Sequence, residues 1–298
     1  MLPNGKKIAA GITLFNPEIE RLKENITATL CQVEHLYLVD NNSNNTAGIK
    51  VDYSLDERVT VISNDENSGV AAALNQMCNA AAADGYRWIL TLDQDSLPET
   101  DIIEKYLPFT ENEEVALITP KFDDDNEPDM ISSAKEEPFT FIERCNTSAS
   151  LVRLSVFGKV GGFDEKMFID CVDFDYCTTL LENGYKILRV NDAVLHHRLG
   201  EASEVKFFIP IGRLFGIKKL QKSFFTYNHS PLRTYYYARN IRYYAYKHKD
   251  FIDLKTEKRV YIKWLVLKLG FEKQKFQKLK AILKGKKDAK KMINDYLK

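Results

Sequence analysis

The chain has no long apolar run. No stretch approaches the 18 or so consecutive apolar residues that a helix needs to span a bilayer. The amino terminus reads Met-Leu-Pro-Asn-Gly-Lys-Lys and carries no hydrophobic signal region. From these two absences we expect neither an integral membrane protein nor a secreted protein. They favour a cytoplasmic protein.

Cysteine is scarce and follows no pattern. The five cysteines are odd in number, scattered, and include no Cys-x-x-Cys pair. A disulfide framework and a cysteine-bound zinc site are therefore not expected, and a reducing compartment is indicated. The sequence also has no internal repeat and no RNA-binding motif, so no nucleic-acid partner is expected.

The chain of 298 residues lacks a net charge, with 42 basic and 42 acidic residues. This balance conceals two opposed parts. Residues 1–205 carry 17 basic against 36 acidic residues, whereas residues 206–298 carry 25 against 6, a net charge of +19. By charge alone the basic part would suit a membrane surface, lipid phosphates or nucleic acid, and the lack of an RNA-binding motif favours the first two. The alternative is that the two parts simply neutralise each other.

Strand and helix signals alternate over the first two hundred residues. Expected strands lie at residues 7–13, 35–39, 59–63, 88–92, 148–152, 186–190 and 193–197, and expected helices at about 16–29, 68–83, 154–160 and 172–183. Ser68 is expected to cap the second helix. Repeated βα units predict an α/β fold with a mostly parallel central sheet and helices on both faces. We expect this domain to occupy residues 1–228, followed by a basic, aromatic-rich helical region at 229–298.

Polar residues follow the ends of the expected strands. They are Asn16, Asp40, Asn64, Asp65, Asp93 and Asp95. In a parallel sheet such ends meet at one edge, where open α/β folds bind their ligands. Asp93 and Asp95 come directly after a buried strand, and two carboxylates there suit Mg²⁺ or Mn²⁺ accompanied by a substrate diphosphate. A solvated turn is the alternative for an isolated Asp-x-Asp.

Six motifs, in order and at the expected spacing, resemble glycosyltransferase family 2 over about residues 6–205. They lie at residues 13–17, 40–43, 67–71, 93–96, 161–165 and around Asp173. Residues 92–96, 168–173, 197–200 and 229–240 are similar to the rhamnosyltransferase branch of that family. The resemblance implies a GT-A (Rossmann-like) fold, an inverting mechanism and a divalent cation. It also implies a dTDP-L-rhamnose donor and an acceptor in bacterial surface polysaccharide synthesis.

The resemblance implies a nucleotide-binding set. This set is Thr13, Phe15, Asn16, Asp40, Asn67, Gly69, Asp93, Gln94, Asp95, Arg233 and Arg239. Asp40 would accept a hydrogen bond from the N3–H group of a thymine or uracil, with a turn-capping role as the alternative. Gly69 would let the backbone approach the nucleotide, with a packing role as the alternative.

The remaining expected roles concern the metal and the reaction. Asp95 is expected to bind the metal directly, Asp93 to complete that site or contact the ribose, and His197 to serve as a further ligand. Transfer also needs a carboxylate that takes the acceptor proton. By family position Asp173 is that base, and Asp170, together with Tyr236, lines the sugar or acceptor pocket.

Two departures from the family bear on the donor. Val172 stands before the base, where an acid is more usual, and Tyr176-Cys177-Thr178-Thr179 follows it, where branch members carry Trp and Arg. A UDP-hexose or UDP-N-acetylhexosamine donor therefore stays open, as does a non-catalytic nucleotide-sugar-binding protein.

The basic region has its own expectations. Arg233 and Arg239 could bind the diphosphate of the donor or of a lipid-linked acceptor bidentately. Residues 256–298 carry 14 basic against 4 acidic residues and include Trp264 in an amphipathic stretch. We expect this segment to lie on the anionic inner leaflet of the cell membrane, near a lipid-linked acceptor. A packed helix or a homodimer interface is the alternative.

Overall fold

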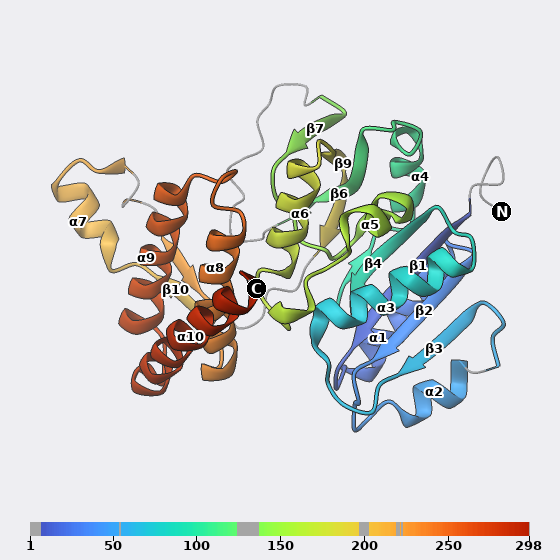
Figure 1. Cartoon of the computed structure of the whole chain (residues 1–298), viewed down its shortest axis with the longest axis horizontal. Helices are drawn as coiled ribbons and strands as arrows, with labels where there is room; N and C mark the ends of the chain where they lie inside the picture. Colours follow the sequence, from blue (N-terminus) through green and yellow to red (C-terminus); the bar gives the residue numbers. More distant parts are fainter. Residues whose placement is uncertain are drawn as a thin grey trace. The chain divides into compact units, whose positions relative to one another are not determined.

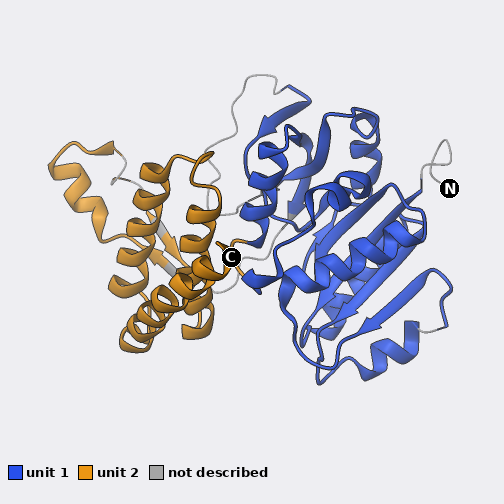
Figure 2. Ribbon diagram, in the orientation of Figure 1, with its two compact units in different colours: residues 1–168, 172–198 blue, residues 169–171, 199–298 orange. Residues whose placement is uncertain are grey.

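The computed structural model describes residues 7–53, 55–123, 137–196, 203–218, 221 and 223–297. Two compact units divide the chain (Figure 2): residues 1–168 and 172–198 form the first, and residues 169–171 and 199–298 form the second. None of the helices in the described ranges combines the length and apolar character needed to cross a bilayer.

The first unit is built on a nine-stranded sheet with the order β3-β2-β1-β4-β8-β6-β9-β5, in which β7 also pairs with β9 (Figure 1). The strands are β1 (Ile8–Leu14), β2 (His35–Asp40), β3 (Val59–Ser63), β4 (Trp88–Asp93), β5 (Leu97–Pro98), β6 (Val115–Asp123), β7 (Phe139–Ile142), β8 (Ser150–Arg153) and β9 (Lys186–His196). Six of them (β1, β2, β3, β4, β6 and β9) run in one direction, and β5, β7 and β8 run in the other. The predicted, mostly parallel sheet is confirmed.

Helices cover both faces of this sheet, as predicted. They are α1 (Ile19–Leu30), α2 (Ala47–Tyr53), α3 (Gly69–Ala83), α4 (Ile102–Tyr106), α5 (Leu154–Val160) and α6 (Val172–Glu182), with short 3₁₀ turns at Leu107–Phe109 and Glu165–Met167. Side chains alternate along β1. Ile8 and Ile12 belong to the apolar core that also holds Leu22 of α1. Gly11 faces the other way, because a Cβ there would lie 2.5 Å from Met77 Sδ of α3.

Three local expectations differ from the structure. Ser68 makes no capping bond at the start of α3; the side chain of Asn67 accepts from Gly69 N instead, at 2.9 Å. The strands expected at 186–190 and 193–197 form the single strand β9, which carries a bulge opposite Pro120 and Lys121. Strands β6 and β7 were not predicted.

The second unit is mainly helical. It contains the hairpin of β10 (Ser203–Val205) and β11 (Phe224–Thr226), and the helices α7 (Phe208–Leu214), α8 (Pro231–Lys247), α9 (Leu254–Gly270) and α10 (Lys275–Tyr296). Helix α10 lies against α8, where a Cβ on Gly285 would come 2.7 Å from Tyr235 O. The helical character expected after residue 228 is present.

The boundary of the second unit falls before residue 228. Residues 199–228 cluster with the helices, whereas the sequence expectation placed them in the first domain. The Phe207 and Phe208 rings pack on Phe271, with centroids 5.8 and 5.4 Å away. Asn228 Oδ1 accepts from Lys273 N at 3.1 Å and from Lys278 Nζ at 3.2 Å. These contacts tie the segment to α9 and α10.

Candidate active site

The carboxyl ends of four parallel strands meet at one edge of the sheet. Thr13 is in register with both Val39 of β2 and Asp93 of β4, and Asp40 is in register with Ser63 of β3. The backbone at Thr13 therefore lies between the backbones that carry Asp40 and Asp93. The expectation that the polar strand-end residues gather at a single edge is met by Asp40 and Asp93, with Thr13 between them.

The loops that follow β1 and β4 are bonded to each other. Phe15 N donates to Gln94 Oε1 at 2.7 Å, and Gln94 Nε2 donates to Phe15 O at 3.3 Å. Asn16 ties the loop after β1 to the loop after β2, since Asn16 N donates to Ser43 Oγ at 2.8 Å. This arrangement leaves the Phe15 side chain 46% exposed at the edge. An exposed aromatic ring beside carboxylates can stack on a nucleobase.

Thr13 presents an unsatisfied hydroxyl at the same edge. Its Oγ1 is buried and has no hydrogen-bond partner among the described residues. A buried hydroxyl without a partner is costly in a native protein and calls for an explanation, such as a ligand group or a water that completes it. Of the residues in the predicted nucleotide set, Thr13 is thus the one whose polar atom the described chain leaves unmatched.

Asp40 is used within the chain. Its side chain is fully buried, with Oδ1 accepting from Ser43 N at 3.1 Å and Oδ2 accepting from Thr46 Oγ1 at 2.9 Å and from Lys50 Nζ. Burial alone would raise the pKa of the Asp40 carboxyl. The hydrogen bonds from Lys50, Ser43 and Thr46 together outweigh burial, so the pKa lies below its usual value. The geometry favours the turn-capping interpretation over direct contact with a base.

The backbone of Gly69 lies close to another part of the chain, at Phe168. Its φ of +88° is one that a side chain rarely adopts, and a Cβ there would lie 2.6 Å from Phe168 O. The next residue, Val70, donates its N–H to the same Phe168 oxygen at 2.6 Å. The packing interpretation of Gly69 is the one that this geometry supports. It ties the start of α3 to the segment that leads into α6.

Two residues that sequence reasoning missed hold the turn after β4. Asn25 of α1 is fully buried and donates from Nδ2 to Asp93 O at 2.9 Å. Ser148 Oγ accepts from Asp93 N at 3.3 Å and contacts Ser96 Oγ. Both residues lie more than 50 positions from Asp93 in the sequence, and no local pattern marks them.

The Asp93 and Asp95 carboxylates fit a divalent cation. Asp93 is half-buried at the end of β4, and Asp95 is exposed one turn residue later. The chain positions Asp95 through its backbone, because Asp95 O accepts from Arg21 Nε at 3.1 Å. The described residues contain no cluster of three His, Cys, Asp or Glu side chains that could hold a metal alone. His197, the expected third ligand, lies outside the described residues. Two hard oxygen donors suit an ion that takes its other ligands from a diphosphate and water.

Asp173 lies in the first turn of α6. Its carboxylate is half-buried, and Oδ1 accepts from Phe174 N at 3.0 Å. A carboxylate at this position is stabilised by the helix dipole. Asp175, two residues on, is 1% exposed.

The residues before α6 are strained, since Phe168, Asp170 and Cys171 have φ values of +60°, +65° and +64°. Clustered strain of this kind is typical of functional segments.

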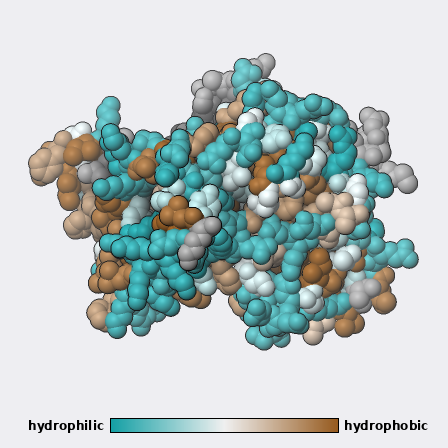
Figure 3. All heavy atoms as spheres, viewed as in Figure 1, coloured by the Kyte–Doolittle hydropathy of each residue, from teal (hydrophilic) through white to brown (hydrophobic). Residues whose placement is uncertain are grey.

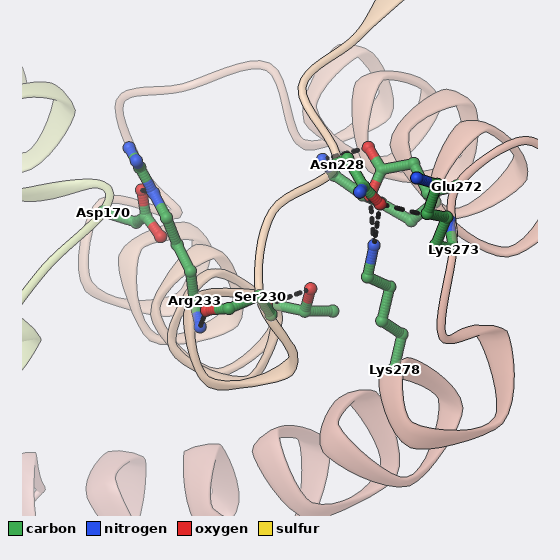
Figure 4. Close-up of polar contacts among 9 residues, drawn as sticks. Asp170, Asn228, Ser230, Arg233, Glu272, Lys273 and Lys278 are labelled. Atoms are coloured by element: carbon green, nitrogen blue, oxygen red, sulfur yellow. Dashed lines mark hydrogen bonds and ion pairs between the residues drawn. The ribbon is translucent and has the colours of Figure 1, made fainter. Parts of the chain in front are cut away.

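Within the second unit, Asp170 is paired with Arg233 (Figure 4). Arg233 Nε donates to Asp170 Oδ1 at 3.0 Å, while Asp170 Oδ2 is buried without a hydrogen-bond partner in the described chain. Burial raises the pKa of Asp170, and the neighbouring Arg233 and Lys268 oppose that effect. Figure 4 also shows the side chain of Ser230, which caps α8 by accepting from Arg233 N at 3.2 Å.

Arg239 and Asn240 form a second contact with this segment. Asn240 is fully buried and donates from Nδ2 to the carbonyl oxygens of Ile169 at 2.8 Å and Asp170 at 2.9 Å. Arg239 Nε donates to Asn240 Oδ1 at 2.8 Å, and its guanidinium lies 4.9 Å from the centre of the Tyr236 ring. Asp170, Arg233, Tyr236 and Arg239 are thus brought together in the second unit. Asn240, which only the branch similarity had marked, is the residue that fixes the backbone.

The fold and the acidic strand ends together define a nucleotide-sugar-dependent transferase of the GT-A kind. The sequence profile of glycosyl transferase family 2 matches residues 11–165, and the chain belongs to this family. The protein is a glycosyltransferase, as predicted.

The chain is similar to three known proteins. The dTDP-rhamnosyl transferase RfbF of Shigella flexneri is 28% identical over 250 residues, which cover 78% of each chain. The structure of TarS from S. aureus in complex with UDP-GlcNAc matches with a TM-score of 0.59 and 14% identity, over 95% of this chain and 80% of that one. The mannosyltransferase PcManGT of Pyrobaculum calidifontis, solved with GDP-Man and Mn²⁺, matches with a TM-score of 0.58 and 13% identity, over 95% and 73%. The two structures share the fold.

Proposed function

We propose that the protein transfers L-rhamnose from dTDP-L-rhamnose, with inversion, to a hydroxyl group of a glycan or lipid-linked acceptor in bacterial surface glycan synthesis. The similarity to the dTDP-rhamnosyl transferase of Shigella flexneri carries this proposal. That alignment spans 250 residues, whereas the family match spans residues 11–165, so the likeness extends well beyond the nucleotide-binding part.

The proposed reaction is a single displacement. Asp173 takes the proton of the acceptor hydroxyl as its oxygen bonds to the anomeric carbon, and the bond from that carbon to the nucleotide diphosphate breaks. The half-buried carboxylate at the start of α6 is suited to this role, because it is both accessible and held by Phe174 N. Asp173 hands the proton on to solvent after transfer.

The nucleotide is proposed to lie at the edge formed by β1, β2 and β4. The exposed Phe15 ring stacks on the base, and the Thr13 hydroxyl bonds a polar group of the nucleotide. Asp93 and Asp95 would hold Mg²⁺ or Mn²⁺, which when bound would neutralise the charge that develops on the departing diphosphate. Asp40 acts indirectly, by ordering the loop that carries Ser43.

The residues that follow the proposed base differ from those of the rhamnosyltransferase branch, but this difference has little bearing on the choice of donor. Tyr176 and Cys177 are each 1% exposed, and the Tyr176 ring packs 4.2 Å from that of Phe163. These two side chains belong to the core beneath α6. A UDP-hexose or UDP-N-acetylhexosamine donor is therefore favoured only by the fold shared with TarS, and it becomes an outcome of the test.

A donor panel tests the proposal. Thermal stabilisation and slow hydrolysis are measured with dTDP-L-rhamnose, dTDP-glucose, UDP-glucose, UDP-GlcNAc and GDP-mannose, each with Mn²⁺ or Mg²⁺. We expect dTDP-L-rhamnose to give the largest shift and the fastest release of nucleotide. A UDP-sugar that outperforms it would overturn the donor assignment. Stabilisation without hydrolysis or transfer for any sugar would favour the non-catalytic binding protein.

A further inference from the structure

The segment around α7 exposes apolar side chains in an unusual density. Over residues 207–217 the exposed fractions are 64% for Phe207, 37% for Ile211, 79% for Leu214, 68% for Phe215 and 46% for Ile217. Figure 3 shows hydrophobic atoms gathered over α7 on the face in view. Single exposed apolar residues are common, but a contiguous group of this size marks an interaction surface.

This apolar group is held in place by the rest of the second unit. The Phe208 ring packs edge-on against Phe271 at 5.4 Å, and Gln221 Nε2 donates to Gly212 O at 3.2 Å. One side of α7 is therefore anchored to the unit. Leu214 and Phe215 are left outside these anchoring contacts, so they are available to a partner.

The charged side chains within this segment are all basic. Residues 206–218 contain Lys206, Arg213 and Lys218 and no acidic residue. Lys206 pairs with Glu204 of β10 at 2.8 Å. The larger segment, 206–298, carries a net charge of +19. Apolar side chains rimmed by cations complement an anionic lipid surface, where the cations meet the headgroups and the apolar groups enter the interface.

The last two helices also expose apolar residues, among them Val260, Ile262 and Val266 of α9 and Phe276 and Leu283 of α10, but none of these is as exposed as Leu214. Trp264, the expected interfacial residue, stacks on Tyr237 at 4.5 Å and on Tyr261 at 5.6 Å. In α10 the exposed Phe276 ring lies under Lys280 Nζ at 4.6 Å, and α10 itself packs on α8. The structure thus partly covers Trp264, the residue that the expected lipid contact of residues 256–298 singled out, and leaves Leu214 and Phe215 of the α7 segment more exposed.

We propose that residues 206–218, with α7 at their centre, are the surface by which the protein docks on an anionic bilayer. This inference adds a partner to the proposed function, because a lipid-linked acceptor lies at a membrane. Vesicle binding itself needs neither donor nor acceptor. The proposed partner is a lipid surface, and the test also distinguishes docking of a second copy of the chain.

Flotation of the full-length protein with vesicles is the experiment. Phosphatidylcholine vesicles with and without phosphatidylglycerol are compared at low and high salt. We expect binding only to the anionic vesicles, weakened by salt. The double variant Leu214→Ser/Phe215→Ser should bind roughly tenfold more weakly or not at all, because it removes two large apolar groups. Arg213→Gln/Lys218→Gln should lose the preference for anionic lipid.

The matched control is Phe276→Ser/Leu283→Ser, which removes two exposed apolar residues from α10. It should float like the unchanged protein, and all three double variants should keep the wild-type circular dichroism and hydrolysis of dTDP-L-rhamnose without vesicles. That hydrolysis tests the proposed function separately. Loss of flotation in the α10 variant alone would overturn the proposal. A second result would also overturn it: light scattering shows a dimer of the unchanged protein and a monomer of Leu214→Ser/Phe215→Ser, and neither of these two proteins binds vesicles.

Discussion

Asp173 is the residue on which the proposed transfer depends most. The conservative change Asp173→Asn keeps the shape of the side chain and removes its ability to take a proton. We expect transfer to fall by about 10²–10⁴-fold, the usual worth of a general base, with nucleotide affinity nearly unchanged. Initial rates and calorimetric binding of dTDP measure the two quantities. Asp192→Asn, at an exposed acid of β9, is the control. Wild-type turnover by Asp173→Asn, with an inactive Asp170→Asn, would move the base to Asp170.

Asp95 carries the prediction about the cation. Its exposed carboxylate is proposed to be a direct metal ligand, so Asp95→Asn should weaken Mn²⁺-dependent binding of a nucleoside diphosphate by about tenfold or more. Binding of the same nucleotide in EDTA should be weak for both proteins. Titration calorimetry with and without Mn²⁺ gives this result independently of turnover. Undiminished activity in excess EDTA would refute a metal-dependent mechanism.

At the scale of elements, the start of α3 depends on a glycine. In Gly69→Ala, the new Cβ would meet Phe168 O at 2.6 Å at a φ of +88°. We expect a loss of about 2–4 kcal/mol in the free energy of unfolding, from backbone strain and overlap together. Gly85→Ala is the matched control, because Gly85 has a φ of +80° and open space around it; strain alone should cost about 1–2 kcal/mol. Urea denaturation measures both. Equal losses would mean that the contact with Phe168 contributes nothing.

Helix α8 fixes the segment before the proposed base through Asn240. In Asn240→Ala two backbone carbonyls lose their donor, which should cost about 1–3 kcal/mol of stability. Because the same segment leads directly into Asp173, we also expect kcat to fall more than the KM for the donor rises. Asn183→Ala, which removes one exposed side-chain bond to Thr179 O in α6, is the comparison. A stability loss with unchanged kcat would leave Asn240 a purely structural residue.

At the scale of the whole molecule, His229 makes stability depend on pH. Burial, followed by the charges of Lys268 and Arg233, lowers the pKa of His229 to about 4 from 6.5. The unfolded chain therefore binds this proton between pH 6.5 and 4 while the folded chain does not. The contribution of His229 to the free energy of unfolding is therefore fully present above pH 6.5, and it is lost as the pH falls from 6.5 towards 4. In His229→Gln the free energy of unfolding should depend less steeply on pH, by a slope that corresponds to the uptake of up to one proton on unfolding. Urea unfolding at several pH values between 6.5 and 4 measures this slope. An unchanged slope would show that His229 titrates normally.

Local chemistry determined much of the first unit. The strands that end at Leu14, Asp40, Ser63 and Asp93 were predictable, because short apolar runs followed by polar turn residues mark buried parallel strands. The order of motifs also identified the family before any geometry was known. Strand β6 was missed because Pro120 interrupts its pattern. Strand β7 was missed because Phe139 and Phe141 are exposed rather than buried.

Only the tertiary structure decided how the candidate residues are used. Asp40 and Gly69 had two interpretations each, and their contacts with Thr46 and Phe168 favour capping and packing. Asn25 and Ser148 support the turn at Asp93 from distant parts of the chain. Such roles depend on which segments meet across the fold.

The second unit shows the same division. Its helical character and its charge of +19 follow from the sequence, because residue propensity and charge are local properties. The exposure of α7 and the partial burial of Trp264 do not, since both helices carry apolar residues among cations. Which apolar face is covered depends on the partner that packs against it. Here Tyr237 and Tyr261 cover Trp264, while Leu214 and Phe215 stay exposed.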